Sequence, residues 1–384
     1  MEISNDEELT AQLALNRVPG VGPLAFSNLL QCFDTASAVF GANRQQLLRV
    51  PDLTVEIVDL LVRGMDATNV EQDVLWLEQD PGHQVIYLSQ ADYPALLAQI
   101  HRPPPVLFLK GDASILHTAQ LAMVGSRNPT SGGIENARAF ARNLATTGLT
   151  ITSGLAAGID GAAHQGALDA KVSINGSDRK GRTIAVAATG LDRIYPSRHR
   201  DLAYEIAENG LLVSEFPVGT GPLRTNFPRR NRLISGLSLG TLVVEAALRS
   251  GSLITARYAT EQGREVFAVP GSIHSPLSRG SHWLIQQGAK LVETAEDIAE
   301  EILPILPSRQ DVNENQVDVE ALVPELSKDE QVLLNAIAYD PVSMDGLLSR
   351  TGMLIDDLST NLSRLELQGL IDNLPGGRYC RKDG

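Results

Sequence analysis

Four arginines lie close together near the middle of the chain, with an aromatic residue and two amides among them. They belong to the set Arg224, Asn226, Phe227, Arg229, Arg230, Asn231 and Arg232. A guanidinium group binds two phosphate oxygens at once, and an aromatic ring or an amide can stack on a base or hydrogen-bond to it. A basic run is usually a solvated charged surface, but this one joins two elements of an apolar, glycine-rich region. We therefore expect the run to bind phosphates, while Phe227 either stacks on a base or belongs to the core.

Two glycine-containing loops offer backbone amides for the same chemistry. Each follows a short apolar run, residues 121–124 or 149–152, that is typical of a buried strand. The loop residues that we expect to line a binding site are Gly125, Ser126, Arg127, Ser153, Gly154 and Gly158. Backbone N–H groups in such loops bind anions, as do those at the N-terminus of a following helix. The loops therefore predict a phosphate-binding site.

Alternating strand and helix patterns position these loops. A helical segment, 135–147, separates the first two strands, and Gly148 follows it where a helix C-cap belongs. Further predicted strands and helices alternate along the chain. The strands are 183–188, 211–215, 241–245 and 265–269, and the helices are 159–170, 197–208, 254–262 and 278–287. Such alternation predicts a doubly wound α/β fold with a mainly parallel sheet, to which short strands at 85–88 and 106–109 are added. The loops and the arginines then line one crevice, because parallel strands end on one rim.

The net charge of −14 argues against a nucleic-acid partner at first sight. Residues 121–290, however, hold 19 Lys and Arg against 12 Asp and Glu, a net +7, so the remainder of the chain is −21. Much of the acidity falls in a stretch rich in Asn, Asp, Glu and Pro, where we predict an acidic linker over residues 306–326. The charge distribution is thus compatible with a polyanion bound to the central segment.

Several enzyme signatures are absent or misplaced. Neither G-x-G-x-x-G nor the P-loop pattern occurs, and Cys32 and Cys380 lie far apart, so we expect no cofactor and no metal. Ser238 matches G-x-S-x-G, but its strand follows the motif instead of preceding it. Asp160 and Glu245 are the acids near strand ends that could act in catalysis, and Asp160 could cap the next helix instead.

Both ends of the chain predict small separate domains. Residues 1–82 form a helical domain in which a glycine hairpin, Val18–Pro23, either holds a phosphate, as in SAM or helix-hairpin-helix domains, or merely turns the chain. Residues 327–384 have a capping box at Ser327, three helices and a hairpin, which together predict a winged helix. Residues 327–383 hold 6 basic and 9 acidic residues, so we favour protein contact or self-association over DNA-groove binding.

Seven sequence blocks, in this order, resemble the bacterial DNA-processing protein A (DprA/Smf) family over roughly residues 85–300. They are Met123–Arg127, Ser153–Asp160, Gly190–Pro196, Phe227–Ser238, Glu245–Ala246, Ser250–Ala256 and Val266–Gly271. One departure is Val172–Lys180, which looks like an insertion, and its contact with DNA is left open.

The resemblance implies a Rossmann-like domain, residues 83–305, that binds single-stranded DNA without catalysis. It implies a cytoplasmic homodimer that acts in natural transformation (competence), protects incoming DNA and loads the RecA recombinase for DNA recombination. The family's DNA pocket falls on the loop residues named above and on Arg229, Arg230, Asn231 and Arg232. We expect no membrane segment, because no apolar run approaches spanning length. Two alternatives remain: a nucleotide phosphoribohydrolase-like enzyme with Glu245 as general base and Arg127 as phosphate anchor, or an interaction scaffold built on the winged helix.

Overall fold

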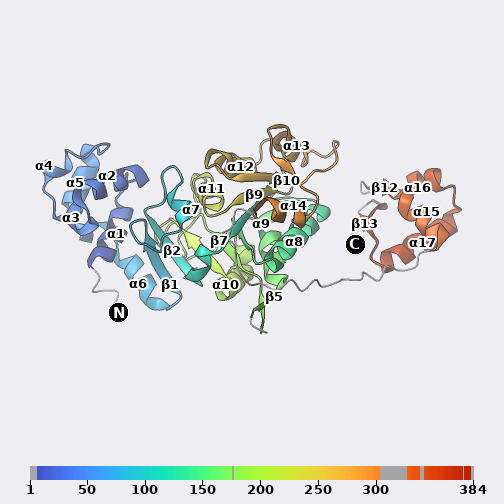
Figure 1. Ribbon diagram of the computed structural model, residues 1–384, viewed down its shortest axis with the longest axis horizontal. Helices are drawn as coiled ribbons and strands as arrows, with labels where there is room; N and C mark the ends of the chain where they lie inside the picture. The colour runs from blue at the N-terminus through green and yellow to red at the C-terminus, as the bar shows by residue number, and fades with distance from the viewer. Residues whose placement is uncertain (1–6, 175–176, 303–326, 338–340, 375, 382–384) are drawn as a thin grey trace. The chain divides into compact units, whose positions relative to one another are not determined.

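The computed structural model describes residues 7–174, 177–302, 327–337, 341–374 and 376–381 (Figure 1). The chain divides into two compact units near residue 308, and each is described by itself. The predicted linker, residues 306–326, lies outside the described residues. In the parts that the structure describes, no helix is both long and apolar enough to cross a bilayer.

A small all-α segment opens the first unit, as predicted. Its helices are α1 (Glu7–Arg17), α2 (Pro23–Phe33), α3 (Ala36–Gly41), α4 (Arg44–Leu47), α5 (Val55–Val62), the 3-10 turn η2 (Met65–Thr68) and α6 (Glu71–Gln79). The expected glycine hairpin joins α1 to α2, where Gly20 has φ +89° and Pro23 begins the second helix. Leu13, Leu29 and Val58 are fully buried where these helices meet.

A nine-stranded sheet forms the centre of this unit, in the order β1-β2-β8-β7-β4-β3-β9-β10-β11. The strands are β1 (His83–Tyr87), β2 (Val106–Gly111), β3 (Gln120–Val124), β4 (Thr150–Ser153), β7 (Thr183–Val186), β8 (Leu211–Ser214), β9 (Gly240–Val243), β10 (Glu265–Ala268) and β11 (Lys290–Leu291). Strands β3, β4 and β7 to β11 are parallel, while β1 and β2 add an antiparallel edge. The prediction of a mainly parallel sheet is confirmed.

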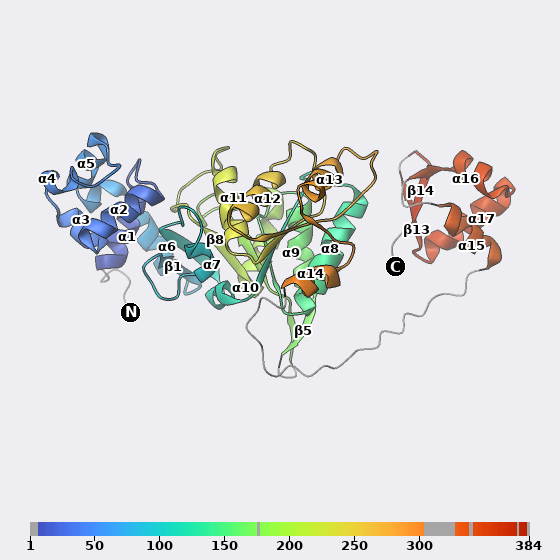
Figure 2. The ribbon, with the colours of Figure 1, turned by 45° about the horizontal axis from the view of Figure 1, so that its top comes forward.

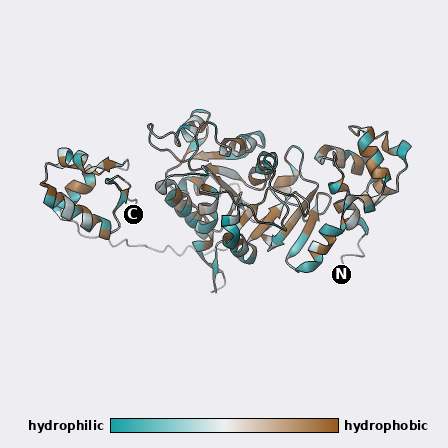
Figure 3. Cartoon of the chain, turned by 180° about the vertical axis from the view of Figure 1, so that it is seen from behind, coloured by the Kyte–Doolittle hydropathy of each residue, from teal (hydrophilic) through white to brown (hydrophobic). Residues whose placement is uncertain are grey.

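Helices cover both faces of the sheet, so its central strands are buried along their whole length and are mostly apolar (Figure 3). The helices are α7 (Ala95–Ala98), η3 (Ala113–His117), α8 (Ser131–Thr146), α9 (Ile159–Asp169), η4 (Ser197–His199), α10 (Arg200–Asn209), α11 (Asn226–Gly236), α12 (Ser252–Glu261), α13 (Arg279–Gln286) and α14 (Ala295–Ile302). Helices α8, α9 and α14 pack with Met123 and Ile151 on one face, and α11 to α13 pack with Val124 and Val186 on the other. The fold is therefore doubly wound, and the chain reverses direction across the sheet between β3 and β9.

The predicted insertion is an antiparallel pair, β5 (Lys171–Ile174) with β6 (Ser177–Lys180). It connects the end of α9 to the start of β7, and Figure 2 shows it projecting away from the sheet. The start of β7 lies on the rim opposite the strand ends that carry the predicted site. The hairpin and the glycine loops therefore lie at opposite ends of the parallel strands.

The second unit is a winged helix, as predicted. Its elements are α15 (Lys328–Ala336), β12 (Val342–Ser343), α16 (Met344–Thr351), α17 (Ile355–Leu367), β13 (Ile371–Leu374) and β14 (Arg378–Arg381). Strands pair antiparallel in the order β12-β14-β13. The expected capping box is present, since Glu330 N donates to Ser327 Oγ at 3.2 Å and Ser327 N donates to Glu330 Oε2 at 2.8 Å.

Candidate functional site

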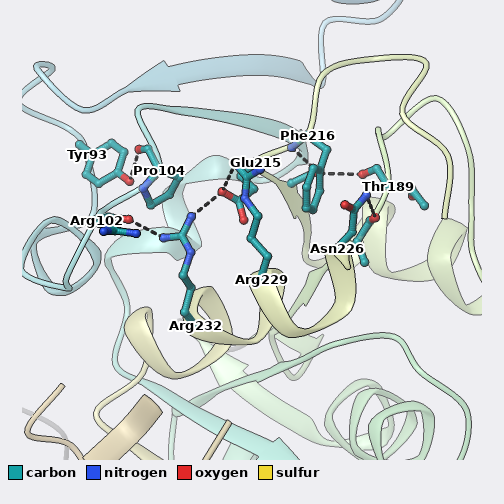
Figure 4. Close-up of polar contacts among 11 residues, drawn as sticks. Tyr93, Arg102, Pro104, Thr189, Glu215, Phe216, Asn226, Arg229 and Arg232 are labelled. Atoms are coloured by element: carbon teal, nitrogen blue, oxygen red, sulfur yellow. Dashed lines mark hydrogen bonds and ion pairs between the residues drawn. The ribbon is translucent and has the colours of Figure 1, made fainter. Parts of the chain in front are cut away.

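The predicted arginine run is a helix, α11, and this helix directs its arginines to different places. Arg229 and Arg232 both donate to Glu215 Oε2, at 3.0 and 2.5 Å, and Glu215 follows β8 (Figure 4). Arg232 also donates to the carbonyl oxygen of Arg102 at 2.7 Å, and only 11% of its side chain is exposed. Arg229 remains 46% exposed and lies over the ring of Phe216, 5.1 Å from its centroid. Arg229 is therefore the accessible cation of this pair.

Arg230 lies inside the protein, only 3% exposed. Its Nη1 donates to the carbonyl oxygens of Gly154 and Val186, and its Nε donates to Asn231 Oδ1 at 3.2 Å. Burial lowers the pKa of Arg230 to about 10, although the nearby Asp160 carboxylate opposes this shift. Arg230 thus holds the loop after β4 to α11 through the protein's own carbonyl groups.

The loop after β3 presents Arg127 at its tip. Ser126 fixes the turn, because its Oγ accepts from Asn128 N at 3.1 Å and its carbonyl oxygen accepts from Ile159 N at 3.1 Å. Gly125 has no room for a side chain, since a Cβ there would lie 2.6 Å from Ile159 Cγ1. Arg127 is exposed, and its Cζ lies 5.4 Å from the centroid of the Phe227 ring.

The loop after β4 is shaped by glycines and by Ser153. Ser153 is fully buried and donates to the carbonyl oxygen of Met123 at 2.6 Å, which ties β4 to β3. Gly158 has φ +83°, and a Cβ there would lie 2.7 Å from Pro129 Cδ. The two glycine loops therefore touch each other, as the sequence predicted from a shared rim.

A small cavity of about 70 Å³ lies where these loops meet α11. We call it the strand-end pocket; its lining residues are Arg127, Gly154, Ala156, Ala157, Ala188, Tyr195, Pro196, Arg198 and Phe227. The rings of Tyr195 and Phe227 lie 5.6 Å apart at an interplanar angle of 60°, and Tyr195 is 49% exposed. An aromatic pair with two arginines in the same lining can stack on a base and bind the adjoining phosphates.

The structure gathers some of the predicted residues and separates others. Arg127, Gly154 and Phe227 line the strand-end pocket, whereas Ser153 and Arg230 lie beneath it. The interpretation from sequence missed Tyr195 and Arg198, although Tyr195 falls in a block that carried the family resemblance. Their role depends on the loop after β7 folding back toward α11, which residue spacing does not reveal.

Glu245, the candidate general base, follows β9 and contacts the start of α8. Its Oε1 accepts from Thr130 Oγ1 at 2.7 Å and its Oε2 accepts from Thr130 N at 3.0 Å. A Cβ on Gly133 would lie 2.5 Å from the carboxyl carbon, so the carboxylate fills the space at this helix N-terminus. An anionic side chain there satisfies free N–H groups and interacts favourably with the helix dipole. The place where a Rossmann fold commonly binds phosphate is thus already filled.

Two other residues that were considered for catalysis are buried in structural roles. Ser238 is fully buried and donates to the carbonyl oxygen of Ile234 at 2.9 Å. Asp160 accepts from Ala156 N at 3.3 Å inside the loop after β4, and burial raises its pKa, although Arg230 acts against that shift. Among the described residues, no group of three or more His, Cys, Asp or Glu side chains is placed to hold a metal ion.

The fold and the site together define a Rossmann-like α/β protein with a cationic, aromatic pocket at the ends of its parallel strands. The family model for DNA recombination-mediator protein A matches residues 84–303, and the DprA winged helix domain model matches residues 319–377. The chain belongs to the DNA recombination-mediator protein A family, known as DprA or Smf.

Individual relatives agree with this assignment. Protein Smf of Escherichia coli (strain K12) is 47% identical over 320 residues, which cover 82% of this chain and 81% of the relative. The X-ray structure of DNA processing protein A from Streptococcus pneumoniae has a TM-score of 0.66 at 34% identity, covering 76% of this chain and 98% of that one. A structure of DNA processing protein A from Helicobacter pylori, solved to describe the single-stranded DNA binding mode of that protein, has a TM-score of 0.51 at 30% identity, covering 58% of this chain and 97% of that one.

Proposed function

We propose that this protein binds single-stranded DNA in the strand-end pocket and processes DNA during natural transformation. The observation that carries the proposal is the position of the Arg127 guanidinium, 5.4 Å from the Phe227 ring centroid and beside Tyr195. Membership of the family and the single-stranded DNA binding mode described for DNA processing protein A of Helicobacter pylori support the same ligand.

A single strand fits this pocket better than a duplex. Bases in a duplex are stacked and paired, so their faces cannot reach aromatic side chains in a cavity of about 70 Å³. In a single strand, one base can turn toward Tyr195 and Phe227 while its phosphates contact Arg127 and Arg198. Such stacking is tolerant of sequence, because every base has a π-face.

The predicted residues divide into contact and positioning roles. Arg127 and Arg229 are accessible and contact phosphates, and Phe227 contacts a base. Arg230, Asn231, Ser153 and Gly158 hold the loops in place through the contacts described above. Arg232 is engaged by Glu215 and by the carbonyl of Arg102, so it holds α11 against the end of β8.

The action requires no chemical step on the DNA. Glu245, the residue that a phosphoribohydrolase would use as general base, accepts two hydrogen bonds at the start of α8 and abuts Gly133. We expect no free base to be released from a nucleoside monophosphate. Release that is lost in Glu245→Gln would favour the enzyme instead.

The wider cellular role follows from the family resemblance. The protein would act in the cytoplasm as a homodimer, protect incoming single strands from nucleases and load RecA onto them. Faster RecA assembly on oligonucleotides coated with single-strand-binding protein, in the presence of this chain, would test the loading role directly.

The binding experiment is fluorescence anisotropy with a labelled oligothymidine at several salt concentrations. If three or four phosphates are neutralised, log K should fall with log salt at a slope of roughly −2 to −3. We expect Arg127→Ala to weaken binding and to reduce the slope by about 0.7. Arg257→Ala is the control, because Arg257 lies on α12, is 79% exposed and forms an ion pair with Glu261 of the same helix.

The Arg127→Ala variant can overturn the assignment of the site. An Arg127→Ala variant with wild-type affinity and wild-type salt slope would exclude the strand-end pocket. Arg230→Ala is a less direct test, since it removes the donor to two carbonyl groups and leaves the buried Asp160 without its cation. Its circular dichroism and melting temperature must therefore accompany any binding result.

A further inference from the structure

A second and larger cavity lies on the sheet face beside α10. We call it the α10 cavity; it has a volume of about 260 Å³ and is lined by residues that include Lys110, Asp192, Arg193, Arg200 and Tyr204. Helix α10 packs against β2 and β8. All three elements contribute residues to the cavity lining, as does the connection that precedes α10. Its volume is close to the lower limit of about 300 Å³ for small-molecule sites. This space suits a single nucleotide unit.

The charges around the α10 cavity favour an anion. Asp192 is the carboxylate on its wall, and Arg193 neutralises it through bonds of 3.0 Å from Nε and 2.6 Å from Nη2. Asp192 Oδ1 accepts from Gly219 N at 2.9 Å. Lys110 and Arg200 make no ion pair with any residue that the structure describes. The lining thus carries two unneutralised positive charges.

An aromatic ring stands beside one of these cations. Arg200 Cζ lies 5.7 Å from the centroid of the Tyr204 ring, and Tyr204 is 45% exposed although it is a large aromatic side chain. A guanidinium over a tyrosine ring, with a lysine in the same lining, resembles the chemistry of the strand-end pocket. That combination binds a base together with its phosphate.

One segment of chain forms part of both cavities. The connection between β7 and α10 gives Tyr195, Pro196 and Arg198 to the strand-end pocket and Asp192, Arg193 and Ser197 to the α10 cavity. Residues close together on one segment thus line both cavities. A strand that leaves the first pocket over Tyr195 can follow this segment to the second cavity if it is long enough.

We infer that the α10 cavity binds a further nucleotide of the same single strand, with Lys110 and Arg200 on phosphates and Tyr204 against a base. This inference rests on the proposed function, because it extends the path of the DNA beyond the strand-end pocket. It predicts that affinity depends on oligonucleotide length, and that the longer ligand alone uses these residues.

The test compares labelled oligothymidines of about 6 and about 20 nucleotides, lengths that span common single-strand site sizes. For Lys110→Ala/Arg200→Ala we expect about tenfold weaker binding of the longer oligomer, a salt slope smaller by about 1.4, and little change for the shorter one. Tyr204→Ala should also weaken binding of the longer oligomer, whereas Tyr204→Phe should not. The charge-matched control is Arg142→Ala/Arg257→Ala, because both arginines are exposed on other helices, α8 and α12.

The two proposals fail in different ways. A wild-type protein that binds neither oligomer would overturn the proposed function itself. Wild-type binding of both oligomers, with Lys110→Ala/Arg200→Ala behaving like the control on the longer one, would overturn only the α10 cavity. Melting temperatures of all variants show that each one is folded when its binding is measured.

Discussion

Arg230 and Gly154 are 76 positions apart in sequence, yet Arg230 Nη1 donates a hydrogen bond to the carbonyl oxygen of Gly154. The guanidinium lies directly against this glycine, since a Cβ at position 154 would be 2.5 Å from Nη1. Gly154 lines the strand-end pocket while Arg230 is buried beneath it. The wall of the pocket is therefore held by a buried cation that reaches it from α11.

We expect Gly154→Ala to destabilise the protein by about 1–3 kcal/mol, because the new methyl group displaces a buried guanidinium. Binding of single-stranded DNA should weaken as well, since the pocket wall shifts with Arg230. Urea denaturation and fluorescence anisotropy measure the two effects. Gly132→Ala is the matched control: its Cβ would lie 3.9 Å from Thr130 Oγ1, and alanine favours the helix by about 0.5–1 kcal/mol. Equal stabilities of the two variants would contradict the close packing at Gly154.

Phe227 should contribute to affinity through its ring. Phe227→Leu keeps much of the apolar volume but removes the face that Arg127 and Tyr195 share. We expect a loss of about 1–3 kcal/mol in binding free energy if one base stacks there. Phe227→Tyr retains the ring and should bind as the wild type does. Anisotropy with oligothymidine measures both, and wild-type affinity in Phe227→Leu would assign this ring to the core alone.

A buried ion pair joins the helical segment to the sheet. Arg17 donates to both oxygens of Asp73 at 2.5 and 2.8 Å, and both residues bond to Val218 in the loop after β8. Asp73→Ala leaves Arg17 without its partner, and loss of one member of a buried pair costs about 3–5 kcal/mol. We therefore expect a large drop in the urea midpoint.

The control for this variant is an exposed pair in the same helical segment. Arg44 and Asp59 are 3.1 Å apart, with about half of each side chain exposed. Asp59→Ala should change the free energy of unfolding by less than about 1 kcal/mol. Comparable losses of unfolding free energy in Asp59→Ala and Asp73→Ala would show that burial does not set the contribution of the Arg17–Asp73 pair to stability.

The sheet and its loops could be predicted from the sequence because both follow from local patterns. Strands buried on both faces are apolar throughout, so the runs before Gly125 and Ser153 mark strand ends. Neither Arg230 nor Glu245 could be placed in this way. An arginine is normally exposed, and only the carbonyls of Gly154 and Val186, brought close by the fold, allow Arg230 to be buried. Glu245 contacts Thr130 only because β9 pairs beside β3.

The directions of the arginine side chains in the basic run also could not be predicted from the sequence. The sequence predicts that the run joins two elements, whereas residues 226–236 form α11, whose first turn tolerates Pro228. Helical geometry then turns consecutive arginines in different directions. Arg229 contacts Phe216 and is accessible, whereas Arg230 faces the interior, so these two neighbouring arginines do not belong to one exposed cluster.

His164 provides a prediction about pH. This residue of α9 is fully buried, and its Nδ1 lies 2.7 Å from Thr183 Oγ1. The Thr183 hydroxyl donates its proton to the carbonyl oxygen of Ile151 at 2.6 Å, so Nδ1 must be the donor to Thr183. Among the described residues, Nε2 then has no hydrogen-bond partner. The ring is therefore neutral, and burial, with His199 and Arg230 nearby, lowers the pKa of His164 to about 3.

The lowered pKa makes stability depend on pH in a defined direction. The unfolded chain protonates this histidine near pH 6.5, whereas the folded protein keeps it neutral down to about pH 3, so the unfolded state binds the additional proton between these values. Stability contributed by His164 is present above about pH 6.5 and falls by about 1.4 kcal/mol per pH unit below it. His164→Gln keeps a donor for Thr183 but cannot titrate. Between pH 7 and pH 5 we expect the wild type to lose about 2 kcal/mol more than His164→Gln in urea denaturation followed by tryptophan fluorescence. Parallel pH profiles for the two proteins would mean that His164 takes up its proton equally in the folded and unfolded states, against the lowered pKa that burial of the ring gives it.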